Sequence, residues 1–217
     1  MINEELSKVI STWSVLAQTF YEREDVVTIT KELLGKIVVT NFSNILTAGR
    51  IVEAEAYNGP FDKAAHSYNN RRTKRTEVMY ANGGVAYVYL CYGIHQMFNI
   101  VTNKSGIPNA VLIRALEPVA GIDAMLERSN KTVQGFDLTR GPGNVAKALG
   151  LHTRHSGMNL LDNELYIADD GCKYNENQIA ATARIGVDYA AEDALLQYRF
   201  IVKGNKYVSG KKSIITL

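Results

Sequence analysis

The apolar positions near the N-terminal end of the chain recur at nearly helical spacing, at Leu6, Ile10, Trp13 and Leu16. Such spacing places all four side chains on one face, which predicts an amphipathic helix over residues 3–19. We expect this helix to pack on the rest of the protein as an N-terminal extension.

A second helix is indicated directly after Asp25. The stretch "VVTITKELLG" follows this residue, and Asp is a preferred residue for capping the first turn of a helix. Gly35 stands where the periodic pattern stops, as glycine often does at the end of a helix. Two later helices are expected at residues 119–129, after a turn around Pro118, and at 141–150.

Most of the remaining apolar segments are short and read as strands. They cover residues 36–42, 49–57, 85–93, 95–103, 110–118, 183–187, 198–204 and 206–210. The strands follow one another in hairpins instead of alternating with helices, which favours an α+β fold. We therefore predict one domain over residues 20–217: a curved, mainly antiparallel, open-barrel-like sheet flanked by helices. A β-hairpin with its tight turn at Tyr92-Gly93 protrudes from it.

Composition adds limits to this picture. A chain of 217 residues with 46% hydrophobic and 21% charged residues is long enough for one sizeable core. Lys and Arg number 24 against 22 Asp and Glu, a net charge of only +2. A polyanionic partner would therefore require the basic residues to gather on one face.

The two cysteines, Cys91 and Cys172, are far apart in the sequence and form neither a disulfide framework nor a paired zinc motif. Reduced thiols, the absence of a signal-peptide pattern and the absence of an apolar run of roughly 20 residues predict a cytoplasmic protein without membrane contact.

The sequence offers no support for a cofactor or a metal ion. It contains no G-x-G-x-x-G and no P-loop, so a nucleotide cofactor is not expected. His152 and His155 have the spacing H-x-x-H but lack a third ligand nearby, so we expect no metal site.

Residues 51–75, "IVEAEAYNGPFDKAAHSYNNRRTKR", hold the first candidate chemistry. In an extended strand Glu53, Glu55 and Tyr57 share one face, with the two carboxylates roughly 7 Å apart. The simplest interpretation is a solvated strand face on which each Glu is paired with Lys or Arg. A pair of carboxylates at this distance would also suit an inverting sugar hydrolase.

Basic and aromatic residues follow these carboxylates. The basic run consists of Arg71, Arg72, Lys74 and Arg75, and the next hairpin carries Tyr87, Tyr89 and Tyr92. Taken alone, the run predicts a solvated loop and the tyrosines an ordinary sheet. Together they suit phosphate contact and base stacking, either in a non-catalytic nucleic-acid-binding module or in an enzyme that extrudes a base from a duplex.

Five blocks in order, spread over about Phe20 to Ser209, carry a resemblance to a known family. They are "VEAEAYNGPFDKAAHS", "YVYLCYG" followed by "FNIVTN", "VLIRALEP", "TRGPGNVAKAL" and "ARIGV". In these blocks the sequence resembles the alkyladenine (3-methyladenine) DNA glycosylases of base-excision repair. The resemblance implies a monomeric, prokaryotic, DNA-associated enzyme that acts on double-stranded DNA containing a damaged purine.

The resemblance also implies roles for individual residues. Glu55 matches the base that deprotonates the attacking water, and Arg114, with the Ile185 carbonyl, matches the groups that hold this water. The base pocket would be formed by Tyr57, Ala64, His66, Tyr89 and Asn99. Tyr92 matches the wedge that fills the gap left by the flipped nucleotide. Glu53 receives no catalytic role.

Further expectations concern the reaction and the DNA contacts. Because no lysine matches a nucleophile, the resemblance implies direct hydrolysis without strand cleavage. Gly141 and Gly143 open a helix whose N-terminus could bind a phosphate, although a plain helix-entry turn explains them equally well. His95 stands where the resemblance leads us to expect an apolar or aromatic residue. This residue either contacts DNA or closes the hairpin, and we favour the structural role.

Overall fold

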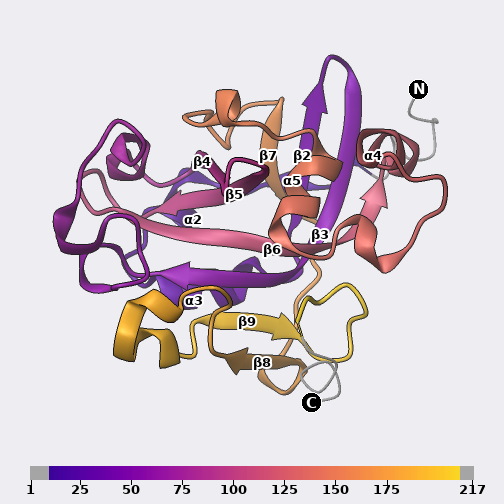
Figure 1. Ribbon diagram of the computed structural model, residues 1–217. Coiled ribbons are helices and arrows are strands. Elements are labelled where there is room, and N and C mark those ends of the chain that lie inside the picture. The colour runs from indigo at the N-terminus through magenta and orange to yellow at the C-terminus, as the bar shows by residue number, and fades with distance from the viewer. Residues whose placement is uncertain (1–9, 211–217) are drawn as a thin grey trace.

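The structure, a computed structural model, describes residues 10–210. Its centre is an antiparallel sheet in the order β1-β7-β2-β3-β6-β5-β4, to which β8 and β9 are attached through the pairing of β9 with β3 (Figure 1). The strands are β1 (Ser14–Val15), β2 (Ile37–Phe42), β3 (Ile45–Tyr57), β4 (Val85–Cys91), β5 (His95–Thr102), β6 (Asn109–Ala120), β7 (Leu165–Asp169), β8 (Ile179–Thr182) and β9 (Arg199–Val202). The predicted α+β class with a curled antiparallel sheet is confirmed.

Helices and short 3-10 turns connect and cover these strands. The α-helices are α2 (Gln18–Tyr21), α3 (Val26–Leu33), α4 (Ile122–Ser129) and α5 (Pro142–Leu149). The 3-10 helices are η1 (Gly59–Phe61), η2 (Tyr68–Asn70), η3 (Glu77–Tyr80), η4 (Phe136–Leu138), η5 (Thr153–His155), η6 (Glu176–Gln178) and η7 (Asp188–Leu195). No helix among residues 10–210 has the length and apolar character required to cross a bilayer.

Helix α3 begins as its sequence predicts. The Asp25 side chain accepts hydrogen bonds from the backbone N–H groups of Val27, at 2.9 Å, and Thr28, at 3.1 Å, which satisfies two donors that the first turn leaves free. Helix α5 ends at Gly150, whose φ of 71° lies in the left-handed region that glycine adopts most easily. Helix α4 starts three residues later than expected because β6 continues to Ala120.

Strand β3 is the central element of the site. It pairs with β6 along one edge and with β2 and then β9 along the other. Its Val52, Ala54 and Ala56 belong to the main core, as the alternation predicts. The prediction that Glu53 and Glu55 lie on a solvated face is wrong, because both residues are completely buried. The sheet curls over this face, which periodicity within one strand cannot reveal.

The β4–β5 hairpin ends in the turn that the sequence predicts. Cys91 pairs with His95, and Tyr92 and Gly93 between them have φ values of 51° and 73°. The Tyr92 side chain is 90% exposed, and its neighbour Ile94 is 72% exposed. The hairpin tip therefore presents an aromatic and an aliphatic side chain to solvent.

Three expectations about elements were wrong. Residues 3–9 of the helix predicted at 3–19 lie outside the described residues, and within the described part Ser14–Val15 forms β1, paired with β7. Residues 183–187 and 206–210 are loops and turns instead of strands. Both segments bind buried charged side chains through backbone groups, as described below. The boundary between an extension and a domain near residue 19 stays a prediction.

Candidate active site

A cleft of about 410 Å³ opens between the β4–β5 hairpin, the loop after β3 and the segment around Ile185. Most of the residues expected at the site line this cleft: Tyr57, Ala64, His66, Arg75, Tyr89, Tyr92, Asn99, Arg114 and Ile185. They come from segments far apart in the sequence. The structure therefore brings together the pocket residues that the resemblance implied.

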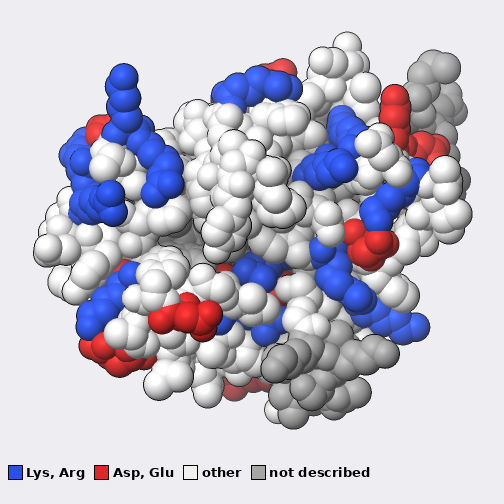
Figure 2. Space-filling model, viewed as in Figure 1, with Lys and Arg blue, Asp and Glu red and all other residues white. Residues whose placement is uncertain are grey.

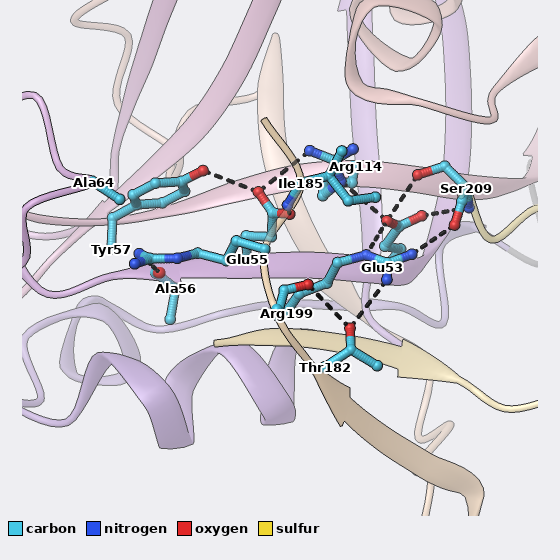
Figure 3. A network of polar contacts seen from close by, with 12 residues as sticks. Glu53, Glu55, Ala56, Tyr57, Ala64, Arg114, Thr182, Ile185, Arg199 and Ser209 are labelled. Atoms are coloured by element: carbon cyan, nitrogen blue, oxygen red, sulfur yellow. Dashed lines mark hydrogen bonds and ion pairs between the residues drawn. The ribbon is translucent and has the colours of Figure 1, made fainter. Parts of the chain in front are cut away.

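Glu55 lies behind the cleft wall and is held by three donors (Figure 3). Its Oε1 accepts from the backbone N–H of Ile185 at 2.9 Å, and its Oε2 accepts from the Tyr57 hydroxyl at 2.9 Å and from Arg114 Nη1 at 3.3 Å. All three partners line the cleft. The carboxylate is thus fixed in one orientation directly behind residues that line the cleft.

The side chains of Tyr57 and Arg114 both carry the protons that they donate to Glu55. Burial, together with the charge of Glu55, raises the pKa of the Tyr57 phenol well above its usual value. Burial lowers the pKa of Arg114, but the opposing charges of Glu55 and Glu53 outweigh it and the pKa is raised. Tyr57 therefore donates as a neutral phenol and Arg114 as a cation.

Glu53 is the centre of a second buried network, which Arg114 connects to Glu55. Its carboxylate accepts from Arg114 Nε at 3.0 Å and from Arg199 Nε at 2.7 Å. It also accepts from the backbone N–H of Ser209 at 2.6 Å and from the Ser209 hydroxyl at 2.8 Å. The expected pairing of this Glu with basic residues is found, in the protein interior instead of at the surface.

Three aromatic rings form one end of the cleft. The ring of His66 lies 4.6 Å from that of Tyr89, edge to face, and its Nδ1 is 2.9 Å from the Tyr87 hydroxyl. Burial, reinforced by the charges of Arg75 and Arg71, lowers the pKa of His66 to about 4. At neutral pH the imidazole is therefore uncharged, and the aromatic wall carries no positive charge of its own.

Asn99 lies on the floor of the cleft with its orientation fixed. Its side-chain amide donates to the carbonyls of Tyr87, at 3.1 Å, and Met97, at 3.3 Å. Only 4% of the residue is exposed. Both amide hydrogens are thus used within the hairpin, and the floor at Asn99 is rigid.

A buried ion pair that the sequence did not reveal holds the loop after β3. Asp62 and Arg184 form a two-pronged contact, and both side chains are almost fully buried. Arg184 also donates to the carbonyl of Ala56 at 2.9 Å and covers the Tyr57 ring at 4.8 Å. This explains why residues 183–187 form a loop: Arg184 turns inward and its neighbour Ile185 donates to Glu55.

The basic run is exposed, but its members differ. Arg72 is paired with Glu77 at 2.5 Å and lies over the Tyr80 ring. No ion pair of residues 10–210 includes Arg71, Lys74 or Arg75. In Figure 2 basic side chains gather at the left, over the segment between β3 and β4, and again at the top and right, around an uncharged central surface.

The start of α5 lies against the hairpin tip. Gly141 precedes the helix with a φ of 89°, and Pro142 follows at its first position and lines the cleft. A side chain at Gly143 would come within 2.9 Å of His95 Nδ1. His95 thus packs on this glycine, in agreement with its expected structural role, and phosphate binding at Gly141 and Gly143 stays a prediction.

On the other side of the hairpin tip lies a second depression of about 660 Å³. Its lining includes the basic residues Arg128, Lys147 and Arg154, which no local sequence pattern connects. His155 nearby accepts from the His152 N–H and stacks on Phe42 at 4.3 Å. Within residues 10–210 no three His, Cys, Asp or Glu side chains are grouped as a metal ion would need.

The cleft combines aromatic walls with a buried carboxylate behind them and an exposed tyrosine in its lining, an arrangement typical of an enzyme active site. A family description of the methylpurine-DNA glycosylases (MPG) matches residues 19–206. The chain therefore belongs to the methylpurine-DNA glycosylase family. It is an enzyme of the DNA-3-methyladenine glycosylase class, whose members act on alkylated bases in base-excision repair.

Bacterial proteins that bear the name "Putative 3-methyladenine DNA glycosylase" are similar over nearly their whole length. The protein of Bacillus cereus (strain G9842) is 46% identical over 201 residues, which cover 89% of this chain and 98% of that protein. The protein of Chlamydia felis is 42% identical over 193 residues, 88% of this chain and 98% of that protein. The family expected from the sequence blocks is thus confirmed.

Proposed function

We propose that the protein flips an alkylated purine of the 3-methyladenine or 7-methylguanine type out of duplex DNA and hydrolyses its N-glycosidic bond with a water activated by Glu55. The observation that carries this proposal is the fully buried Glu55 carboxylate, held by three donors beneath an aromatic cleft. The cleft has the size expected of a pocket for a small ligand.

Glu55 retains the capacity to bind a water. An ionised carboxylate offers about four lone-pair sites, and three donors use three of them. In the proposed step this water attacks C1′ of the sugar and gives a proton to Glu55. The bond from C1′ to the base breaks, and the base leaves with the electron pair, so that an abasic site remains.

The remaining two roles around this water belong to Arg114 and Ile185. Arg114 Nη1 lies 3.3 Å from Glu55, close enough to share a water with it. The structure places the Ile185 N–H on Glu55 at 2.9 Å. We propose that its carbonyl accepts from the attacking water.

The cleft suits a base that carries positive charge. Tyr57 and Tyr89 offer electron-rich rings, which attract cations, and the guanidinium groups of Arg184 and Arg75 already lie over them at 4.8 Å and 6.0 Å. The neutral His66 adds no repulsion, and with a pKa of about 4 it cannot supply a proton to a leaving base at neutral pH. We therefore propose that N3- and N7-alkylated purines, whose glycosidic bonds are already weakened, are better substrates than neutral lesions.

The proposed DNA contacts surround the mouth of the cleft. Tyr92 at the hairpin tip would fill the gap in the duplex, because its ring is exposed and its backbone is held by the turn. The basic run would bind phosphates, and Arg75, which also lines the cleft, would lie nearest to the extruded nucleotide. We also propose that a monomer is active, as the resemblance implies.

The mechanism is proposed as direct hydrolysis because no lysine of the described residues lines the cleft. Without an imine there is no step that cleaves the strand. Borohydride should therefore fail to trap the enzyme on DNA containing methylated purines. A trapped covalent complex would exclude the water mechanism.

The experiment that tests the proposal compares Glu55→Gln with the unchanged enzyme. Methylated DNA is incubated with each, and free base is separated by chromatography. The unchanged enzyme should release methylated purines, and Glu55→Gln should not, although it still binds the DNA. If the protein were a non-catalytic binding module, the unchanged protein would release no base at all. If Glu55→Gln were as active as the unchanged enzyme, Glu55 would have no role in the mechanism.

The sugar hydrolase alternative is less well supported. It needs both Glu53 and Glu55 at the reacting bond, but Glu53 already accepts four hydrogen bonds from Arg114, Arg199 and Ser209. Three of these bonds end on Oε1 and one on Oε2, so this carboxylate is anchored to groups of the protein interior.

A further inference from the structure

Tyr189 lines the cleft, although neither its sequence context nor the resemblance assigned it a role. It combines two properties that seldom occur together in one side chain. The residue is 68% exposed, yet its hydroxyl donates to the carbonyl of Ala64 at 3.0 Å. The ring is therefore open to a ligand while its far end is held in place.

The backbone beneath Tyr189 is also fixed. Val187 and Ala190 on either side of it are buried and pack on Ala64, with Tyr57 against the same cluster. Farther along η7, the Asp193 side chain accepts from the backbone N–H of Lys63 at 2.8 Å. The segment that carries Tyr189 and the loop that carries Ala64 thus form one continuous wall of the cleft.

The part of a nucleotide that would meet Tyr189 follows from its position at the rim. The base of an extruded nucleotide enters first and reaches the floor near Asn99 and Glu55, both almost or completely buried. The sugar stays attached to the DNA backbone and remains at the mouth. An exposed ring at the mouth therefore faces the deoxyribose and not the base.

We propose that Tyr189 is a further substrate-binding residue, whose ring packs against the deoxyribose of the extruded nucleotide. This inference rests on the proposed function. The apolar C–H face of a sugar suits an aromatic face, and a ring already held at its hydroxyl loses little freedom when the sugar binds. The same side chain is hydrogen-bonded to Ala64, in the wall that contacts the base. It therefore fixes the position of the sugar relative to this wall and directs C1′ toward the water on Glu55.

The test is single-turnover excision of 7-methylguanine by four variants, measured on duplex and on single-stranded methylated DNA. Tyr189→Ala and Tyr189→Leu remove the ring, and Tyr189→Phe keeps the ring but removes the hydroxyl. Phe61→Ala removes an aromatic ring that is 82% exposed in the neighbouring loop but does not line the cleft. Thermal unfolding of each variant shows whether the fold is retained.

We expect Tyr189→Ala and Tyr189→Leu to be slower by roughly tenfold, corresponding to about 1.4 kcal/mol of lost packing. The loss should be the same on both DNA forms, because the sugar contact forms after extrusion. Tyr189→Phe should stay within about threefold of the unchanged enzyme, and Phe61→Ala should equal it. If only the hydroxyl mattered, through its bond to Ala64, Tyr189→Phe would be as slow as Tyr189→Ala. Near-normal excision by Tyr189→Phe therefore assigns the effect to the ring.

Two results would overturn the inference. Tyr189→Ala as fast as the unchanged enzyme would exclude any contact, and Tyr189→Phe as slow as Tyr189→Ala would assign the effect to the bond with Ala64 instead of the ring. Failure of the proposed function is distinguishable from both, since the unchanged enzyme would then release no base.

Discussion

Arg199 and Glu53 form an ion pair in the interior of the protein, with 2.7 Å between Nε and Oε1 and both residues 0% exposed. The same carboxylate also faces Arg114. Removing one partner from a buried pair leaves an uncompensated charge, which costs about 3–5 kcal/mol. We expect Glu53→Gln to lower the free energy of unfolding by this amount, measured by urea denaturation.

The matched control is Glu164→Gln, which changes an exposed glutamate directly before β7. This variant should stay within about 0.5 kcal/mol of the unchanged protein. Glu53→Gln should also retain more excision activity than Glu55→Gln, measured at a temperature at which both of these variants are folded. If Glu53→Gln unfolded at the same urea concentration as the control, the buried network would have no stabilising role.

The basic run predicts how DNA binding depends on salt. Arg71, Lys74 and Arg75 have no ion-pair partner among the described residues, whereas Arg72 is paired with Glu77. Each phosphate contact contributes about 0.9 to the slope of log K against log salt. Neutralising these three residues should reduce the slope by about 2 to 3, and Arg72→Gln should change it less. The measurement is fluorescence anisotropy over a series of salt concentrations.

An unchanged slope after the triple change would place the phosphate contacts elsewhere. The depression on the other side of the hairpin tip, with Arg128, Lys147 and Arg154, would then be the next surface to neutralise.

Tyr92 should matter only where a base stack must be opened. Stacking of an inserted tyrosine on neighbouring bases is worth roughly 1–3 kcal/mol. Tyr92→Ser should therefore slow single-turnover excision from duplex DNA by a factor of about 5 to 150. The loss should nearly vanish for a methylated base in single-stranded DNA. An equal loss on both substrates would mean that Tyr92 shapes the cleft, whose mouth it also lines.

His66 should make stability depend on pH below neutrality. Its pKa is about 4 in the folded protein, chiefly because of burial, and about 6.5 in the unfolded chain. As the pH falls from 6.5 toward 4, the unfolded state binds the proton first, so the free energy of unfolding decreases. Above 6.5 His66 contributes no slope. His66→Gln should reduce the difference in unfolding free energy between pH 7 and pH 5.

NMR of the ring protons offers a direct measurement of the same property. The His66 signal should titrate with a midpoint near 4, and the His155 signal likewise, since burial lowers its pKa to about 4 as well. A midpoint near 6.5 for His66 would show that the ring is solvated and would contradict the neutral aromatic wall.

Local sequence patterns predicted those parts of the fold that depend on neighbouring residues. Asp25 caps α3 as expected, and Tyr92-Gly93 forms the expected turn, because capping and turn geometry are set within a few residues. The burial of Glu53 was missed, because its partners Arg199 and Ser209 are about 150 residues away. Likewise, Ser14–Val15 forms a strand only because β7 is available for pairing.

The candidate site also has residues that the sequence indicated and residues that it did not. The sequence blocks indicated the pocket residues, which the structure collects around one cleft. The Asp62–Arg184 pair was missed although both residues lie in the quoted blocks, because no block shows which residue of another block it contacts, and Tyr189 lies outside the blocks. Both depend on the loop after β3 meeting the segment around Ile185, which is a tertiary contact.

The order in which a ribosome makes this chain gives the buried carboxylates a further consequence. Glu53 and Glu55 lie on a strand from the first third of the sequence, but their partners include Ile185, Arg199 and Ser209. During synthesis the two acidic groups leave the ribosome long before the groups that neutralise and orient them. This buried network can therefore form only after Ser209 has been synthesised, so a chain that stops before this residue would lack part of it.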